Sequence, residues 1–264
     1  GNGHPYSWSA ICNGYDADEM AKLTEFSAIP QYLAAAPAGE FGVGDVRVTH
    51  LWMPDPAEAA FCARCAKIPH VVSRPEDVIG HVDAVVIPTD AGETHRTAAE
   101  PFLRAGVPLF IDKPLCLTVE DLEFFAEARR RGAKLMSCSS ARFCPEFLAA
   151  RAGGEFGEIK SVNATVPHRW ETYGIHAVEA LYLFFGPTAA KVTTLGTRDR
   201  SMTAIEYPDG AVATVSCTEG GFPGLWIEIN GRQRTGQVRW TNSFMAFRDT
   251  LRAFHHYLAT GEEP

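Results

Sequence analysis

The sequence lacks the features that mark a membrane protein or a nucleic-acid-binding protein. Its longest apolar runs, such as residues 180–185, are far shorter than the roughly 18 residues that a membrane span needs. It has no cluster of basic residues, and 24 Lys and Arg face 32 Asp and Glu, which gives a net charge of −8. We therefore expect neither a membrane nor a nucleic acid as a partner.

The seven cysteines form no pattern that indicates disulfide bonds or a metal site. Their number is odd and several lie in apolar segments, which is typical of a reduced protein. Cys62 and Cys65 form a CxxC pair in an alanine-rich helical stretch with no second pair, so we expect buried thiols and no metal. No signal-peptide pattern is visible, and together these features predict a cytoplasmic protein.

The composition is that of a globular protein of one or two domains, with 264 residues of which 46% are apolar and 21% charged. In the first half, short apolar runs alternate with helical patterns. We expect strands at residues 46–52, 83–88, 108–111 and 134–139, and helices at residues 56–67, 94–105 and 118–131. This alternation predicts an α/β domain, a doubly wound parallel sheet wrapped by helices.

The second half is richer in strands. We expect them at residues 159–166, 189–197, 203–207, 211–217 and 225–230, with helices at residues 173–185 and 242–259. Asp209-Gly210 between two of these strands is a hairpin signal. The pattern predicts an α+β domain with an open, mainly antiparallel sheet. We place the domains at residues 1–141 and 142–264, and residues 16–44 give no clear pattern.

Three short segments carry residues suited to chemistry. Gly1 to Tyr6 contains a GxG, which lets backbone N–H groups approach a diphosphate, although it also reads as a simple turn. Lys113 follows a predicted parallel strand, at the edge where ligands bind, but could be a solvated loop lysine. His176 and Glu179 share one face of a predicted helix, where a histidine suits proton transfer or a packed core position.

The order of these motifs along the chain is more specific than any one of them. The sequence runs from GxG through "VDAVVIPTDAGETHRTAAEPFLRAGVPLFIDKPL" and "ARFCPEF" to "EFGEIKSV" and "YGIHAVEALYLFFG". It resembles the glucose-fructose oxidoreductase and inositol dehydrogenase family, the Gfo/Idh/MocA family, over nearly the whole chain. The resemblance implies a Rossmann-type domain that binds NAD or NADP, followed by an α+β domain with an open sheet that carries the substrate site.

The resemblance also implies an activity and a set of site residues. Members mostly oxidise or reduce a hydroxyl or ketone of a sugar, inositol or similar polyol, and many form homo-oligomers on the open sheet. The family's catalytic positions correspond to Lys113 and His176. The expected cofactor-binding residues are Gly1, Gly3, His4, Asp55, Thr89, His95, Asp112 and Lys113. The expected substrate-binding residues are Lys113, Arg142, Trp170, Thr172 and His176, and no metal is expected.

Several residues depart from the family pattern. Asp112 replaces a glutamate, Tyr6 replaces a glycine, and Thr172 stands where many members have an aspartate four residues before the histidine. Trp52 and Met53 occupy the place of the acidic residue that binds the adenosine ribose, and Asp55, slightly later, could replace it, which would favour NAD over NADP. Glu179 and Asp90 are two further departures.

Two alternatives to an oxidoreductase remain open at this point. The chain could be a ligand-binding or regulatory protein of the same fold, which the departures at Tyr6 and Thr172 favour, or a lyase or hydrolase that uses the cofactor transiently. The aromatic residues that could stack on a sugar-like ligand are His4, Tyr6, Trp8, His168, Trp170 and Tyr173. Because the family begins with a strand before its GxG, we expect the sequence to be part of a longer chain.

Overall fold

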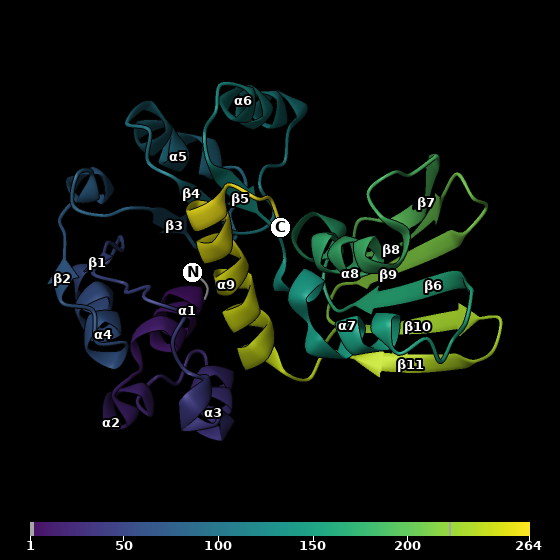
Figure 1. Cartoon of the computed structure of the whole chain (residues 1–264), viewed down its shortest axis with the longest axis horizontal. Coiled ribbons are helices and arrows are strands. Elements are labelled where there is room, and N and C mark those ends of the chain that lie inside the picture. Colours follow the sequence, from purple (N-terminus) through teal and green to yellow (C-terminus); the bar gives the residue numbers. More distant parts are fainter. Residues whose placement is uncertain (1–2, 222) are drawn as a thin grey trace. The chain divides into compact units, whose positions relative to one another are not determined.

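The computed structural model describes residues 3–221 and 223–264, and it divides the chain into two compact units (Figure 1). The first comprises Gly1–Ser137 with Phe247–Pro264, and the second comprises Cys138–Ala246. The domain bounds 1–141 and 142–264 given above stay a prediction. The last helix, α9 (Ser243–Thr260), begins in the second unit, but from Phe247 onward it packs with the first, because its aromatic side chains contact that core.

The first unit contains parallel strands followed by helices, which confirms the predicted α/β architecture. Its strands are β1 (His50–Leu51), β2 (His70–Val71), β3 (Val85–Ile87), β4 (Leu109–Ile111) and β5 (Leu135–Ser137). They form two parallel sheets, β1-β2 and β3-β4-β5. The helices are α4 (Pro56–Cys65), α5 (His95–Arg104) and α6 (Val119–Arg130), with a short 3-10 turn, η2 (Pro75–Val78).

Strand β1 is much shorter than the expected strand at 46–52, and a side chain explains the difference. The amide of Asn13 donates to the carbonyl of Val48 at 2.9 Å and accepts from its N–H at 3.0 Å. These bonds satisfy the backbone of Val48 outside a strand ladder. The apolar pattern alone could not show this, because Asn13 is distant in sequence.

Residues 16–44, for which the sequence gave no clear pattern, contain α2 (Ala17–Met20), α3 (Ala28–Ala35) and the short 3-10 turn η1 (Ala38–Glu40). Helix α1 (His4–Asn13) precedes them. Tyr6 and Trp8, considered as stacking residues for a ligand, are core residues of α1 with exposures of 2% and 4%. Gly3 is the N-cap of α1, and Gly1 lies outside the described residues.

The second unit is one six-stranded sheet in the order β11-β10-β6-β9-β8-β7, and only the β6–β9 pair is parallel. This confirms the predicted mainly antiparallel sheet. Its strands are β6 (Ile159–Val166), β7 (Lys191–Thr197), β8 (Arg200–Glu206), β9 (Val212–Thr218), β10 (Trp226–Gly231) and β11 (Thr235–Arg239). Strand β11 was not predicted, because its sequence TGQVR is almost wholly polar.

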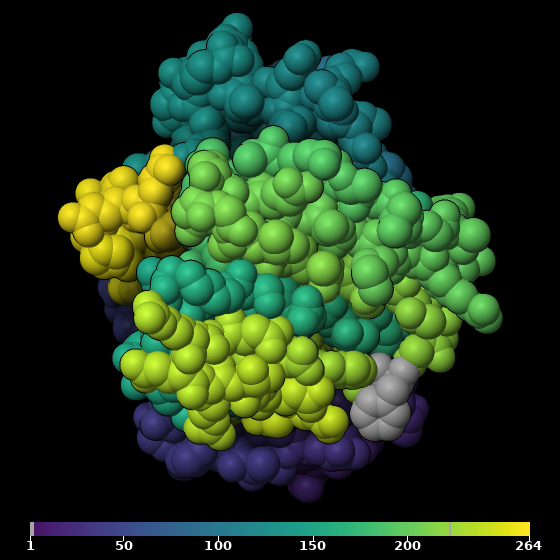
Figure 2. Space-filling model, turned by 90° about the vertical axis from the view of Figure 1, so that its right-hand side faces the viewer, coloured from purple at the N-terminus to yellow at the C-terminus, as the bar shows by residue number. Residues whose placement is uncertain are grey.

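Helices cover one face of this sheet and leave the other open. The core joins Phe147 of α7 (Pro145–Ala152) and Leu181 of α8 (Ile175–Phe185) to alternate strand residues such as Val162 and Val215. Figure 2 shows the opposite face, where the strands lie at the surface. None of the helices in the described part of the chain is long and apolar enough to cross a membrane.

Candidate active site

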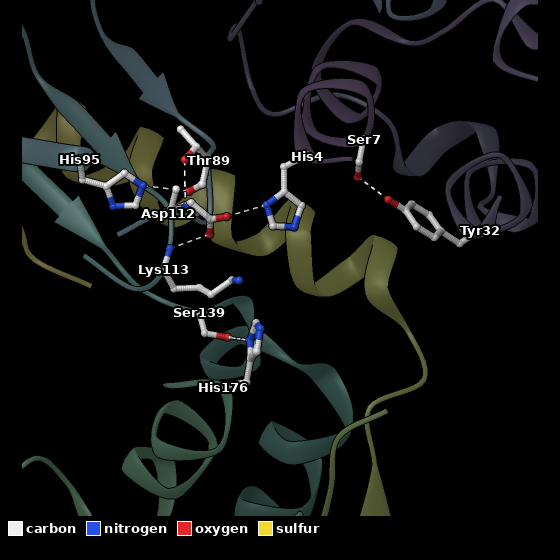
Figure 3. Close-up of polar contacts among 10 residues, drawn as sticks. His4, Ser7, Tyr32, Thr89, His95, Asp112, Lys113, Ser139 and His176 are labelled. Atoms are coloured by element: carbon white, nitrogen blue, oxygen red, sulfur yellow. Dashed lines mark hydrogen bonds and ion pairs between the residues drawn. The ribbon is translucent and has the colours of Figure 1, made fainter. Parts of the chain in front are cut away.

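The first candidate cluster lies in the first unit, at the carboxyl ends of β3 and β4. Asp112 and Lys113 follow β4 directly and are 2% and 5% exposed. A carboxyl oxygen of Asp112 accepts from the backbone N–H of Lys113 at 2.8 Å (Figure 3). Thr89 follows β3, and its hydroxyl oxygen accepts from the N–H of Ala91 at 3.1 Å. The structure thus brings three of the predicted site residues to one sheet edge, where open α/β sheets bind ligands.

His95 connects the two loops of this edge. It is fully buried, and its ring nitrogens lie 2.9 Å from the carbonyl oxygen of Thr89 and 3.1 Å from that of Leu115. The loops also touch directly, since a Cβ at Gly92 would lie 3.0 Å from Pro114 Cγ and 3.1 Å from its carbonyl oxygen. These contacts give His95 a structural role in holding the edge in shape.

The N-terminus of α1 adjoins the same edge through His4. His4 Nδ1 lies 2.7 Å from Asp112 Oδ2 (Figure 3). The His4 ring stacks on Trp8 with centroids 4.3 Å apart. No side chain caps α1, and its first turn has no acidic residue. Backbone N–H groups at such a terminus suit a diphosphate, and a buried lysine nearby suits a ribose or substrate oxygen. The residues present therefore fit a dinucleotide.

Gly3 is required by packing within the first unit. A Cβ at Gly3 would lie 2.3 Å from Ile29 Cδ1 and 3.0 Å from Phe26 Cγ. Both side chains belong to the region around α3. A larger residue at Gly3 would displace this core, so its effect on a cofactor could not be separated from its effect on folding.

Asp55, predicted to bind the adenosine ribose, is the N-cap of α4. Its carboxylate accepts from the backbone N–H groups of Ala57 at 2.8 Å and Glu58 at 3.4 Å. Trp52, which precedes it, is 41% exposed. The capping role explains an aspartate at this position by itself, and ribose binding stays a prediction.

The second candidate cluster lies in the second unit, on α8 and the turn before it. Residues Trp170–Gly174 form a π-helical turn, η4, that leads into α8. A Cβ at Gly174 would lie 2.8 Å from Trp170 Cδ2, so the glycine makes room for the indole. The hydroxyl of Thr172 donates to the carbonyl of Arg169 at 3.4 Å. Such π turns occur often at functional sites.

His176 lies in the first turn of α8, and Ser139 contacts its ring. The Oγ of Ser139 is 2.6 Å from His176 Nδ1 (Figure 3). The rings of Tyr173 and Trp240 meet the imidazole edge to face, with centroids 5.0 Å and 6.1 Å away. The described contact of Nδ1 is therefore with a serine, whereas the hydroxyl of Thr172, which stands where many family members have an aspartate, bonds to the Arg169 carbonyl.

Glu179 and Arg142 form a partly buried ion pair beside this histidine. Arg142 Nε lies 2.5 Å from Glu179 Oε2, and its guanidinium lies over the ring of Tyr182, 4.5 Å from the centroid. The other oxygen of Glu179 accepts from the N–H of Ser139 at 3.4 Å. Burial raises the pKa of Glu179 above the usual carboxyl range, and the guanidinium opposes that shift. The pair holds the 3-10 turn η3 (Ser140–Phe143) against α8.

Sequence reasoning did not identify Ser139, Trp240 or the π turn. Ser139 is separated from His176 by 37 residues and lies outside every motif used. Its only signal in the sequence is its place after a predicted strand and before "ARFCPEF". Within the described residues, no group of three or more His, Cys, Asp or Glu side chains could hold a metal ion.

Part of the first unit is similar in sequence to known proteins. Residues 28–138 match the model of the oxidoreductase family with an NAD-binding Rossmann fold, GFO_IDH_MocA. Inositol 2-dehydrogenase of Rhizobium meliloti is 39% identical over 93 residues, which are 32% of this chain and 26% of that protein. A putative UDP-kanosamine synthase oxidoreductase subunit of Amycolatopsis mediterranei is 29% identical over 109 residues, 41% of this chain and 30% of that protein.

Solved structures extend the likeness to both units. A putative myo-inositol dehydrogenase from Sinorhizobium meliloti has a TM-score of 0.72 at 22% identity, covering 83% of this chain and 84% of that one. Scyllo-inositol dehydrogenase from Lactobacillus casei, solved with NAD(H) and scyllo-inositol, has a TM-score of 0.69 at 17% identity, covering 82% of each chain. At these identities the likeness shows the fold.

The chain thus has two units, a Rossmann-type α/β unit and a unit with a mainly antiparallel sheet. Residues 28–138 of the first unit match the Gfo/Idh/MocA family model, whose description is an NAD-binding Rossmann fold, in agreement with the resemblance seen in the sequence. The matched segments span between a quarter and a third of the curated relatives.

Proposed function

We propose that this protein is a NAD(P)-dependent oxidoreductase that acts on a CH–OH group of a sugar-like or polyol substrate. The observation that carries the proposal is the buried Lys113 at the carboxyl edge of a sheet of the NAD-binding Rossmann family. The names of the relatives, which include several inositol dehydrogenases, support a cyclic polyol as substrate.

The chemistry assigns one task to each unit. Oxidation of a carbinol releases a hydride and a proton, and the bound nicotinamide supplies the hydride acceptor. We propose His176 as the general acid/base, because an imidazole titrates near neutral pH. Lys113 is the electrostatic partner, since an ammonium group stabilises negative charge on the substrate oxygen. Arg142, Trp170 and Thr172 stay candidates for substrate contact.

The cofactor would be held by residues of the first unit. We propose Gly3, His4 and the α1 N-terminus for the diphosphate, with Thr89, Asp112 and Lys113 toward the nicotinamide side. Gly1 and Asp55 are the other residues that we propose for cofactor binding. His95 contributes by holding together the loops that follow β3 and β4. An NAD preference follows if Asp55 binds the ribose, because a carboxylate repels the 2′-phosphate of NADP.

We propose a cytoplasmic homo-oligomer with a small-molecule substrate and no nucleic acid or membrane partner. The seven cysteines are all unpaired, which suits a reducing compartment. The uncovered sheet face of the second unit supports an interface between subunits.

The test of the function is a screen followed by two substitutions. Thermal shifts with NAD, NADP and a panel of inositols and sugars identify ligands, because a ligand that binds only the folded state raises its stability. On the substrate found, His176→Ala should lower kcat by about 10²–10⁴-fold with nearly unchanged cofactor affinity. Lys113→Ala should lower turnover and also weaken cofactor binding.

Three outcomes would contradict the proposal in different ways. Cofactor binding without turnover of any carbinol indicates a binding or regulatory protein. Turnover of substrate without net change of the nicotinamide indicates a lyase or hydrolase. Near-normal turnover in His176→Ala makes the histidine a packed helix residue.

A further inference from the structure

Ser139 makes two side-chain hydrogen bonds that together constrain its hydroxyl proton. It follows β5 and is the N-cap of η3, where its Oγ accepts from the backbone N–H of Ala141 at 3.1 Å. The same Oγ lies 2.6 Å from His176 Nδ1. Ser139 is 0% exposed, so solvent does not reach the hydroxyl.

Counting donors and acceptors fixes the direction of the second bond. A serine hydroxyl has one hydrogen to donate and lone pairs to accept. The N–H of Ala141 can only donate, so it occupies a lone pair of Oγ. Among the residues that the structure describes, the remaining partner of this oxygen is His176 Nδ1. The hydroxyl hydrogen is satisfied only if Nδ1 accepts it, since a buried unmade hydrogen bond is costly.

We propose that Ser139 sets the tautomer of His176, so that the neutral ring carries its hydrogen on Nε2 and accepts at Nδ1. The contacts of Tyr173 and Trp240 with the imidazole hold the ring plane in which this bond forms. The cost of an unsatisfied buried hydroxyl corresponds to a preference of about tenfold or more over the other tautomer. Ser139 is thus a positioning residue, and its importance for catalysis rests on the proposed function of His176.

This tautomer determines which hydrogen bond the neutral histidine can form with a substrate oxygen. In the neutral state Nε2–H is a hydrogen-bond donor and has no lone pair for a proton. To act as a base at Nε2, the ring must first exchange protons with water, losing the hydrogen on Nε2 and gaining one on Nδ1, and the Ser139 hydroxyl must turn to accept from Nδ1–H. The substrate proton then moves to Nε2 and leaves an imidazolium bound to Oγ. A carboxylate in place of Ser139 would remove this step, because it can only accept.

The experiment is ¹⁵N NMR of the ring nitrogens of His176 in the free protein above about pH 8, where histidine is neutral. The wild type should show a protonated Nε2 and an unprotonated Nδ1. Ser139→Asp should exchange the two, because aspartate accepts at Nδ1 and also caps η3. Ser139→Ala should bring the ring back toward the tautomer mixture of free imidazole.

Thr172→Val is the matched control, since its hydroxyl contacts the Arg169 carbonyl and the tautomer should stay as in the wild type. A protonated Nδ1 in the wild type, or a Ser139→Asp spectrum like that of the wild type, overturns the inference. If Ser139→Asp does not fold, the wild-type and Ser139→Ala spectra still decide it. The measurement needs no turnover, so failure of the proposed oxidoreductase activity is seen separately, in the His176→Ala kinetics.

Discussion

Arg142 and Glu179 illustrate how a buried charge depends on its partner. The Glu179 side chain is 7% exposed and that of Arg142 is 22% exposed, so neither charge is well solvated. Removing one member of such a pair leaves the other uncompensated, which costs more than the intact pair contributes. The ion pair therefore affects the stability of the second unit mainly when one of its two members is removed.

Arg142→Met should lower the free energy of unfolding by about 3 kcal/mol at neutral pH. The pKa of Glu179 is already raised in the folded state, and loss of the guanidinium raises it further. A carboxyl with a raised folded pKa binds more protons folded than unfolded, so the stability of the variant should fall as pH rises above the unfolded value of about 4.3.

Urea unfolding near neutral pH and near pH 4 measures this dependence. Adding Glu179→Gln should recover most of the loss at neutral pH, because the unpaired charge is gone. A penalty for Arg142→Met that is equal at both pH values would show that lost packing on Tyr182 is the cause.

At the scale of elements, the apolar pattern predicted the strands and helices that pack into the cores. It missed the elements that depend on a side-chain hydrogen bond or on pairing at a sheet edge. Strand β6 matches its predicted bounds. Helix α6 begins directly after Thr118, the first residue of the predicted helix, whose Oγ1 accepts from the N–H of Asp121 at 3.1 Å. The short β1 and the polar β11 depart from prediction because Asn13 and an edge pairing determine them. Lys113 and His176 followed from motifs, whereas the contact of Ser139 with His176 required the folded chain.

Helix α4 offers a test that separates capping from cofactor binding. Asp55→Asn keeps a good N-cap and removes only the charge, so stability should be unchanged and any preference for NAD over NADP should shrink several-fold. Asp55→Ala should lose the same preference and also about 1 kcal/mol of stability. Chemical denaturation and calorimetry with both cofactors provide the two readouts. An unchanged preference in Asp55→Asn would leave Asp55 with the capping role alone.

At the scale of the whole molecule, the open face of the second unit is the surface that we propose for self-association. Leu195 of β7 and Met202 of β8 are cross-strand partners on this face, and they are 67% and 50% exposed. Thr214 of β9 lies on the same face and donates to Asn163 at 2.8 Å. An apolar group amid paired polar side chains is typical of a subunit interface.

Leu195→Lys should weaken the oligomer about tenfold or more, because association would bury an unpaired charge. Val192→Lys is the control, since Val192 lies on the same strand and is 57% exposed, but it pairs with Ile205 on the helix-covered face. Sedimentation of the two variants over a range of concentrations measures the difference. A monomeric wild type, or equal behaviour of the two variants, would exclude this face as the interface.

Helix α9 has a consequence for how the protein is made. Phe247 contacts the rings of His4 and Trp8, and Phe254 contacts Phe110. This late segment therefore supplies aromatic side chains to a core whose other aromatic members precede it by a long way in the sequence. During synthesis, the partners of Phe247 leave the ribosome long before Phe247 does. By then all the strands of the second unit have been synthesised. The first unit is therefore the first to enter synthesis and the last to have its core complete.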